Sequence, residues 1–238
     1  MMQGLLYGIR RFPVDLKNSD LFLLFLSIVL AVSAITGVTF LGDRLQLSIK
    51  QQAAVVLAAD VTLRSTAPIG PKYLSIAKEQ ELNTAETISF LSMALHGGNN
   101  VLSSIKTTTP EYPLRGKLKL LDFNGQNIDK PTGSPMSGNV WAEQSLIDRF
   151  NIAKGDSITI GNKRFVVSAV LADFPDRNVG FLTFAPTVIA NIEDLDAMGV
   201  IQPGSRALYR QFYSGRERQL ESFLDDLQDL PAENKNTS

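Results

Sequence analysis

The chain has 238 residues, which is enough for one large domain or two small ones. Hydrophobic residues make up 44% and charged residues 20%, and this balance excludes a disordered or collagen-like chain. The net charge of -1 predicts no general attraction to nucleic acid. Because there is no cysteine and one histidine, the composition also excludes a disulfide framework, a thiolate metal site and a site with several histidine ligands.

An uncharged apolar run over residues 21–42 predicts a transmembrane helix. At the helical rise this run would be ~33 Å long, enough to cross a hydrocarbon core of ~30 Å. Arg10, Arg11 and Lys17 precede it, and the positive-inside rule therefore places the N-terminus in the cytoplasm. Residues 43–238 would then lie on the other side of the inner membrane, in the periplasm of a Gram-negative cell.

A cleaved signal peptide is the alternative reading of the same run. Val32 and Ala34 satisfy a small-residue cleavage rule, which would give a mature N-terminus at Ile35. The leader before the run is long and contains two aspartates, and the apolar residues continue to Leu41. Both features favour an uncleaved anchor.

Apolar residues at helical spacing flank the predicted span on both sides. Residues 1–20 form a basic cytoplasmic leader, which fits a short amphipathic helix at the membrane interface as well as it fits a frayed end. After the span, apolar residues recur at steps of three and four from Leu41 to Val56. This pattern predicts a stalk helix over residues 43–59, although the first helix of a globular domain would look the same.

Two separated stretches, residues 60–110 and 205–230, have the pattern of a split α/β sandwich. The expected elements are, in chain order, strands over 60–64, 85–95 and 101–107 with a helix from 71 to about 82, and then a strand over 206–213 and a helix over 216–230. Such a sandwich would need one more strand, so we expect an unpaired edge in the sheet that holds the strand 206–213. Residues 231–238 form a polar tail.

Residues 111–204 lie between these stretches and are rich in expected strands, so they predict an inserted β-rich subdomain and an α+β fold overall. The expected strands cover 116–123, 139–143, 157–160 and 163–172, with short helices over 144–150 and 187–196. Gly161-Asn162 joins two of the strands and suits a type II′ hairpin turn.

Sequence motifs for chemistry are absent. The chain has no phosphate-binding loop, no dinucleotide fingerprint and no nucleophile elbow, so we expect no ATP binding, no cofactor and no catalytic residue. His96 is the one candidate base, and we expect it to be a solvated residue of a hairpin turn. Two acidic groups lack the ligand spacing of a calcium loop, so we expect no metal site. These groups are Glu193, Asp194 and Asp196, and Asp225, Asp226 and Asp229.

Several short stretches in a fixed order carry a resemblance to a known family. They are residues 58–61 (AADV), 112–116 (YPLRG), 138–141 (GNVW), 155–160 (GDSITI), 184–186 (FAP) and 200–206 (VIQPGSR). Behind one N-terminal membrane helix, this ordered set resembles the FtsX-like/MacB-type ABC transporter permeases, in particular their YbbP-like subgroup. The resemblance covers nearly the whole chain.

The resemblance implies a first membrane helix that extends into a stalk and carries a periplasmic core, with a porter-like α/β part and an inserted β-rich part. It also implies a cytoplasmic ABC ATPase as partner, and the remaining permease helices or a second permease copy. ATP-driven movement would pass through the stalk to the core, which acts on lipophilic cargo or on an export partner. The permeases of the family have no catalytic residues of their own.

The matched residues are expected to have mostly structural roles. Trp141 is expected in the core rather than as a cargo contact, and Arg115 and Arg206 are expected to tie the two parts together or to form weak surface ion pairs. Four matched glycines suit turns with positive φ or close packing: Gly116, Gly138, Gly155 and Gly204. The loop 173–177 (DFPDR) places an apolar ring between charges and is a candidate partner contact.

The chain departs from the family because no second run of membrane-spanning length follows residue 42. We therefore expect an N-terminal portion of a permease: a truncated product, a split reading frame or one region of a longer protein. The alternative is a complete membrane-anchored periplasmic scaffold or binding protein without transport activity.

Overall fold

The structure, a computed structural model, describes residues 19–129, 133–176, 185–202 and 204–228. The chain divides into two compact units, residues 1–52 and 53–238. Most of the predicted leader and all of the predicted polar tail lie outside the described residues.

Helix α2 (Ser19–Leu57) contains the apolar run. Its segment Phe22–Gly42 has a mean hydropathy of 2.4 and is 0% buried, and it is the one helix among the described residues that is long and apolar enough to cross a membrane. The side-chain hydroxyls of Ser27 and Thr39 donate to backbone carbonyls of the same helix, as hydroxyls in an apolar segment must. The helix continues without interruption to Leu57, and Ala58 then leaves it with φ +64°.

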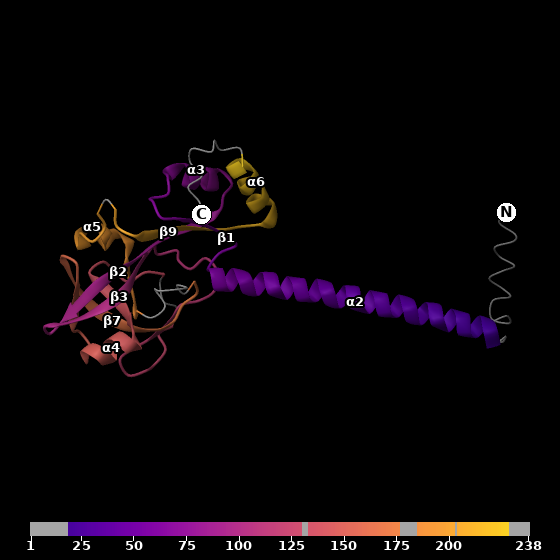
Figure 1. The fold of residues 1–238 in the computed structure, drawn as a ribbon, viewed down its shortest axis with the longest axis horizontal. Coiled ribbons are helices and arrows are strands. Elements are labelled where there is room, and N and C mark those ends of the chain that lie inside the picture. Colours follow the sequence, from indigo (N-terminus) through magenta and orange to yellow (C-terminus); the bar gives the residue numbers. More distant parts are fainter. Residues whose placement is uncertain (1–18, 130–132, 177–184, 203, 229–238) are drawn as a thin grey trace. The chain divides into compact units, whose positions relative to one another are not determined.

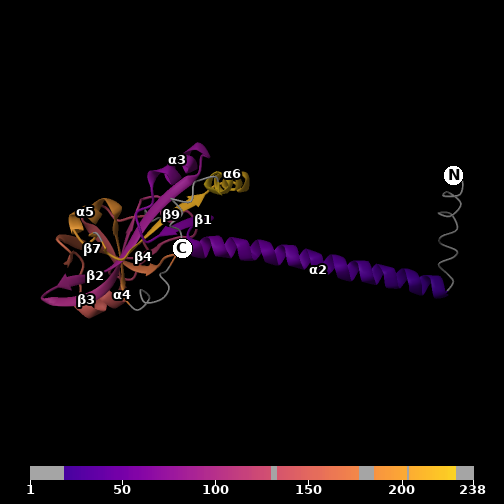
Figure 2. The ribbon, with the colours of Figure 1, turned by 45° about the horizontal axis from the view of Figure 1, so that its top comes forward.

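Residues 53–238 are built around one mixed sheet (Figures 1 and 2). In spatial order the described strands are β1 (Val61–Ser65), β9 (Ala207–Ser214), β2 (Asn83–His96), β3 (Asn99–Thr108), β8 (Thr187–Asn191), β5 (Asn139–Glu143), β7 (Lys163–Asp173) and β4 (Lys119–Leu121), with β6 (Ser157–Ile160) beside both β2 and β7.

Six of the described strands close into a barrel, because β6 pairs with both β7 and β2. The ring runs through β2, β3, β8, β5, β7 and β6, and the pairs β3–β8 and β5–β7 are parallel. The interior is apolar and closely packed, and helix α4 (Gln144–Phe150) contributes Leu146 to it. Fully buried interior side chains include Phe165, Ile105, Ile158 and Val188.

Strand β2 links the barrel to the rest of the sheet. Along one edge, its residues 83–90 pair with β9 and its residues 94–95 pair with β6. Helices α3 (Pro71–Glu79) and α6 (Glu217–Gln228) lie side by side over the β1–β9 end of the sheet (Figures 1 and 2). Proline suits the first position of α3, and α6 packs Phe223 against Tyr213.

The α+β class and most of the predicted elements are confirmed, but one expectation is wrong. Residues 187–196 do not form one helix: they form β8, then a 3₁₀ turn (Ile192–Asp194) and α5 (Leu195–Met198). The run TVIAN is buried on both faces because it completes the barrel between β3 and β5. The strand 206–213 corresponds to β9, which lies between β1 and β2. The outermost described strand at this end of the sheet is therefore β1.

The predicted hairpin turn is confirmed, since Gly161 has φ +57° and Asn162 is not in the positive-φ region. The division into a porter-like domain with an inserted subdomain stays a prediction. Strands β2 and β3 take part in both groups of pairings, so one continuous sheet joins the two regions.

Candidate functional site

A buried charge cluster lies on the outer face of the barrel, where β3, β9 and the end of β7 meet. Lys106 Nζ donates to the backbone carbonyl of Asp176 at 2.8 Å and lies 3.2 Å from its Oδ2. Arg210 Nη1 donates to the same Oδ2 at 2.8 Å. The three side chains are 0%, 6% and 3% exposed for Lys106, Arg210 and Asp176. Because buried charges must be paired, Asp176 fixes the segment after β7 against β3 and β9.

Aromatic rings complete this cluster. Lys106 Nζ lies 5.5 Å from the ring centroid of Tyr112 and 5.1 Å from that of Phe174. The phenol of Tyr112 donates to the carbonyl of Pro175 at 2.8 Å. Burial, with a contribution from the Asp176 charge, raises the pKa of Tyr112 well above its usual value, so the phenol stays a neutral donor.

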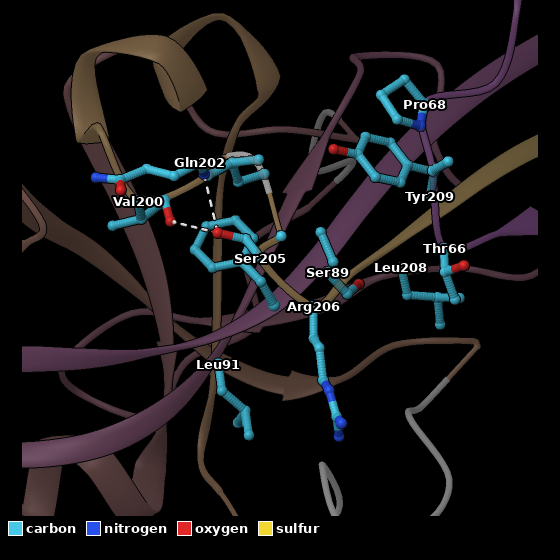
Figure 3. Close-up of a pocket in the computed structure, with 15 residues that line it drawn as sticks. Thr66, Pro68, Ser89, Leu91, Val200, Gln202, Ser205, Arg206, Leu208 and Tyr209 are labelled. Carbon is cyan, nitrogen blue, oxygen red and sulfur yellow. Dashed lines mark hydrogen bonds between the residues drawn. The ribbon is translucent and has the colours of Figure 1, made fainter.

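A cavity of about 1170 Å³ lies close to this face, at the end of β9 (Figure 3). Its walls come from the segment after β1, from β2 and β9, and from the loop before β9. Apolar side chains supply much of the lining: Pro68, Phe90, Leu91, Val200, Ile201 and Leu208. Within the loop, Ser205 Oγ accepts from the Gln202 amide at 2.9 Å, which holds the wall in shape.

Ser89 and Arg206 are polar side chains of the cavity that lack partners among the described residues. Ser89 is only 1% exposed, and its buried hydroxyl has no hydrogen-bond partner in the described part of the chain. No hydrogen bond or ion pair within the described residues engages the side chain of Arg206, which is exposed. Figure 3 shows Arg206, from the loop before β9, and Leu91, from β2, extending in the same direction. The cavity is therefore an apolar surface with one cation at its border and one unsatisfied hydroxyl.

The structure places His96 differently from the expected solvated turn residue. It is the last residue of β2, is half-buried, and its Nδ1 lies 2.8 Å from the carbonyl of Ser157. Since a carbonyl only accepts, Nδ1 carries the proton. The ring also packs 5.8 Å from that of Phe150. His96 thus joins β2 to β6.

The members of the first acidic group differ in burial. Glu193 and Asp196 are exposed, whereas Asp194 is buried. Its carboxylate accepts from Lys163 Nζ at 2.6 Å, from the Gly138 amide at 2.9 Å and from the hydroxyl of Ser137. Burial by itself would raise the pKa of Asp194, but these bonds outweigh it and lower the pKa. No group of three metal-ligating side chains occurs among the described residues. Asp225 and Asp226 lie on the exposed side of α6, and Asp229 lies outside the described residues.

The matched residues have the predicted structural roles in most cases. Trp141 is 6% exposed in an apolar cluster outside the barrel. Arg115 makes a bidentate contact with Asp60, Nε to Oδ1 at 3.0 Å and Nη2 to Oδ2 at 2.7 Å. Arg206 makes no such contact with any residue that the structure describes. The four matched glycines all have positive φ: Gly116, Gly138, Gly155 and Gly204.

The candidate partner loop is corrected by the structure. Phe174 is only 4% exposed because it packs in the apolar cluster outside the barrel, and Asp176 is consumed by the charge cluster. Arg177 lies outside the described residues. The segment therefore acts as an internal tie and not as an exposed apolar contact.

Sequence reasoning missed the buried charge cluster and the cavity. One signal was available: five of the six residues 103–108 (SSIKTT) are polar, although they lie in a predicted strand, and all six are buried. A polar strand buried on both faces requires internal partners. The sequence pattern did not identify these partners. For Lys106 the partner, Asp176, is 70 residues away in the sequence.

The comparisons with known proteins agree with one another. The family model of the MacB-like periplasmic core domain matches residues 21–219. An uncharacterized ABC transporter permease of Escherichia coli (strain K12), YbbP, is 26% identical over 214 residues, which cover 90% of this chain and 26% of the relative. The chain thus spans about a quarter of the length of that relative.

The solved structures that match the chain share little sequence with it. The periplasmic region of MacB from Actinobacillus actinomycetemcomitans has a TM-score of 0.46 at 13% identity, over 70% of this chain and 81% of that one. The extracellular domain of the ABC-type transporter YknZ from Gram-positive bacteria has a TM-score of 0.48 at 10% identity, over 75% and 96%. A domain of a permease protein from Porphyromonas gingivalis has a TM-score of 0.44 at 10% identity, over 73% and 85%.

Proposed function

The chain belongs to the family of the MacB-like periplasmic core domain, as its ordered motifs predicted, and from this membership we propose that it works as part of an ABC transporter permease. In this role it contains the first membrane helix and the extracytoplasmic core. A separate cytoplasmic ATPase supplies the energy, and the core acts on lipophilic cargo or on an export partner.

The continuity of helix α2 is the observation that carries this proposal. One helix includes the membrane-spanning segment and continues to Leu57. Ala58 and Ala59 follow at once and are 0% exposed, and Asp60 is clamped by Arg115. In this proposal, residues 43–59 act as a stalk that passes displacement of the membrane segment to the core, and the continuity of α2 in sequence from Ser19 to Leu57 supports it.

The other parts of the role follow from the family and the sequence. The remaining permease helices, or a second permease copy, would complete the path across the membrane, because one helix cannot enclose one. We propose a porter-like part over residues 60–110 and 205–230 with an insertion over 111–204, an inner-membrane location and a cytoplasmic N-terminus. An alkaline phosphatase fusion after Ser238 should be active, and an inactive fusion contradicts the orientation.

Nucleotide chemistry belongs to the partner in this proposal, and the chain is not an enzyme. The purified chain should therefore show no saturable binding of ATP in calorimetry. Saturable binding would contradict the assignment.

A helix break tests the coupling role. In a permease that contains this chain, reconstituted with its ATPase, Gln51→Pro removes a backbone hydrogen bond in α2 and kinks or breaks the helix, at a cost of ~3 kcal/mol. We expect ATP hydrolysis to continue while its coupling to transport is lost, and Gln51→Ala to behave like the wild type. Normal transport with Gln51→Pro would contradict the coupling role of α2.

A further inference from the structure

We propose that the cavity at the end of β9 binds an amphiphile with a single hydrocarbon chain and an anionic head group. The proposal deepens the proposed function and rests on it for the role of the ligand as cargo. Three observations carry it: the apolar lining, the cation at the border and the unsatisfied hydroxyl inside.

The lining is suited to hydrocarbon. At about 1170 Å³, the cavity lies slightly above the usual range for small-molecule sites, ~300–1,000 Å³. An apolar strip continues from it along the outer face of β2. Leu91 belongs to both, and Met93 and Leu95 follow on the same face, with Leu102 of β3 opposite Met93. These four side chains are 41%, 40%, 43% and 49% exposed for Leu91, Met93, Leu95 and Leu102.

The strip leads from the cavity along β2. From Leu91 to Leu95 the strand covers about 13 Å at a rise of ~3.3 Å per residue. A hydrocarbon chain seated in the cavity would lie along this strip and remove its exposed apolar surface from water. The strip is one pair of strands wide, which suits one chain.

The polar groups are suited to an anionic head. The guanidinium of Arg206 has no partner within the described residues and is a strong bidentate donor for a carboxylate or a phosphate. The hydroxyl of Ser89 is buried and unsatisfied, which carries a free-energy cost that a ligand oxygen would remove. Both residues line the cavity next to Leu91.

Photo-crosslinking of the full chain tests the proposal. The chain is placed in nanodiscs of phosphatidylcholine, and a palmitate analogue with a diazirine on its hydrocarbon chain is the probe. Labelling of residues 22–42 measures partition into the bilayer, and labelling of residues 87–95 and 200–209 measures the site. We expect saturable labelling of the site that unlabelled palmitate displaces. Labelling of the site that rises without saturation overturns the proposal.

Two substitutions separate ligand binding from structure. Arg206→Gln should lower labelling of the site about tenfold, the effect of losing a charge-assisted hydrogen bond, whereas Arg164→Gln, an exposed arginine of β7 outside the cavity, should leave it unchanged. Ser89→Ala should lower labelling, because it removes the hydroxyl that would bond to the ligand. In the chain without ligand it should raise the urea midpoint, because there the hydroxyl is buried without a partner among the residues described. Unchanged labelling in both variants overturns the proposal.

The head group and the occupant are tested in the same way. A lysophosphatidylglycerol probe should label the site as palmitate does if any anionic head suffices, and its failure would restrict the site to carboxylates. A hexadecanol probe should label it about tenfold less. Equal labelling by the alcohol overturns the anionic assignment, and a crosslinker at Leu91 that captures a second copy of the chain overturns the amphiphile. These assays need no ATPase, so a failure of coupling leaves their outcome unaffected.

Discussion

The two faces of strands β2 and β3 differ in the residues that they bury and expose, although Ser103 and Thr107, on the same face as Ile105, are also buried. On the face inside the barrel, the buried residues include Phe90, Ala94 and Ile105, and the cluster there is apolar. On the outer face, Thr87, Ser89 and Lys106 are buried although they are polar, whereas other outer residues are apolar and exposed. The exposed ones are Leu91, Met93, Leu95 and Leu102.

The difference shows that each face is stabilised by different physics. The interior depends on apolar packing, which is non-directional and tolerates few voids. The buried part of the outer face depends on directional contacts to a distant segment, through Asp176. Packing in the core does not account for the apolar side chains of the exposed part. For this reason the exposed part is a candidate binding surface.

The largest expected effect is a loss of stability, and it should differ between two neighbouring residues of β7 that lie on opposite faces. Phe165→Ala empties a fully buried position of the barrel interior and should cost about 3–5 kcal/mol of unfolding free energy. Val166→Ala, one residue further and 41% exposed, should cost less than ~1 kcal/mol. Urea unfolding followed by the fluorescence of Trp141, the one tryptophan of the chain, measures both. Similar losses for the two variants would contradict the description of β7 as one wall of a packed barrel.

The next effect tests the charge cluster. Asp176→Asn keeps the shape of the side chain and tolerates the φ of +56°, but it leaves two buried cations without their shared carboxylate. We expect a loss of about 3 kcal/mol. The control is Asp173→Asn, where a half-exposed carboxylate lies 3.7 Å from Lys119, and it should change stability by less than ~0.5 kcal/mol. Equal effects would show that the buried cluster does not hold the segment.

A cross-strand pair gives effects of opposite sign. Thr87 and Thr108 face each other on the outer face, and both are buried. The hydroxyl of Thr108 donates to the carbonyl of Gly133 at 2.9 Å, whereas that of Thr87 has no partner among the described residues. Thr87→Val should therefore stabilise the chain by ~1 kcal/mol and Thr108→Val should destabilise it by ~1 kcal/mol. Thermal unfolding of both variants beside the wild type checks the signs.

The smallest effect appears as a pH dependence. The lowered pKa of Asp194 means that its stabilising contribution is present above its unfolded-state pKa of ~3.9 and is lost as the pH falls through the folded-state value. The difference in urea midpoint between the wild type and Asp194→Asn should therefore shrink as the pH drops below about 4. A constant difference down to pH 2 would show that the ion pair with Lys163 does not carry this contribution.

Much of the local structure was determined by the sequence alone. The uncharged run 21–42, the period-2 alternation of β2 and β7, and the proline that begins α3 each depend on neighbours within a few residues. The glycines with positive φ and the Gly161 turn were also predictable from the sequence, since both depend only on the backbone conformation of a short segment. The family was also readable, because its short motifs stand in a fixed order.

Tertiary structure decided what joins distant segments. The run 187–191 becomes a strand because the barrel needs a member between β3 and β5, and short apolar runs do not distinguish strand from helix. The burial of Lys106 depends on a contact with Asp176, 70 residues away in the sequence. The cavity beside Arg206 likewise exists only where β9, β2 and the segment after β1 come together, and alternation along one strand does not contain that information.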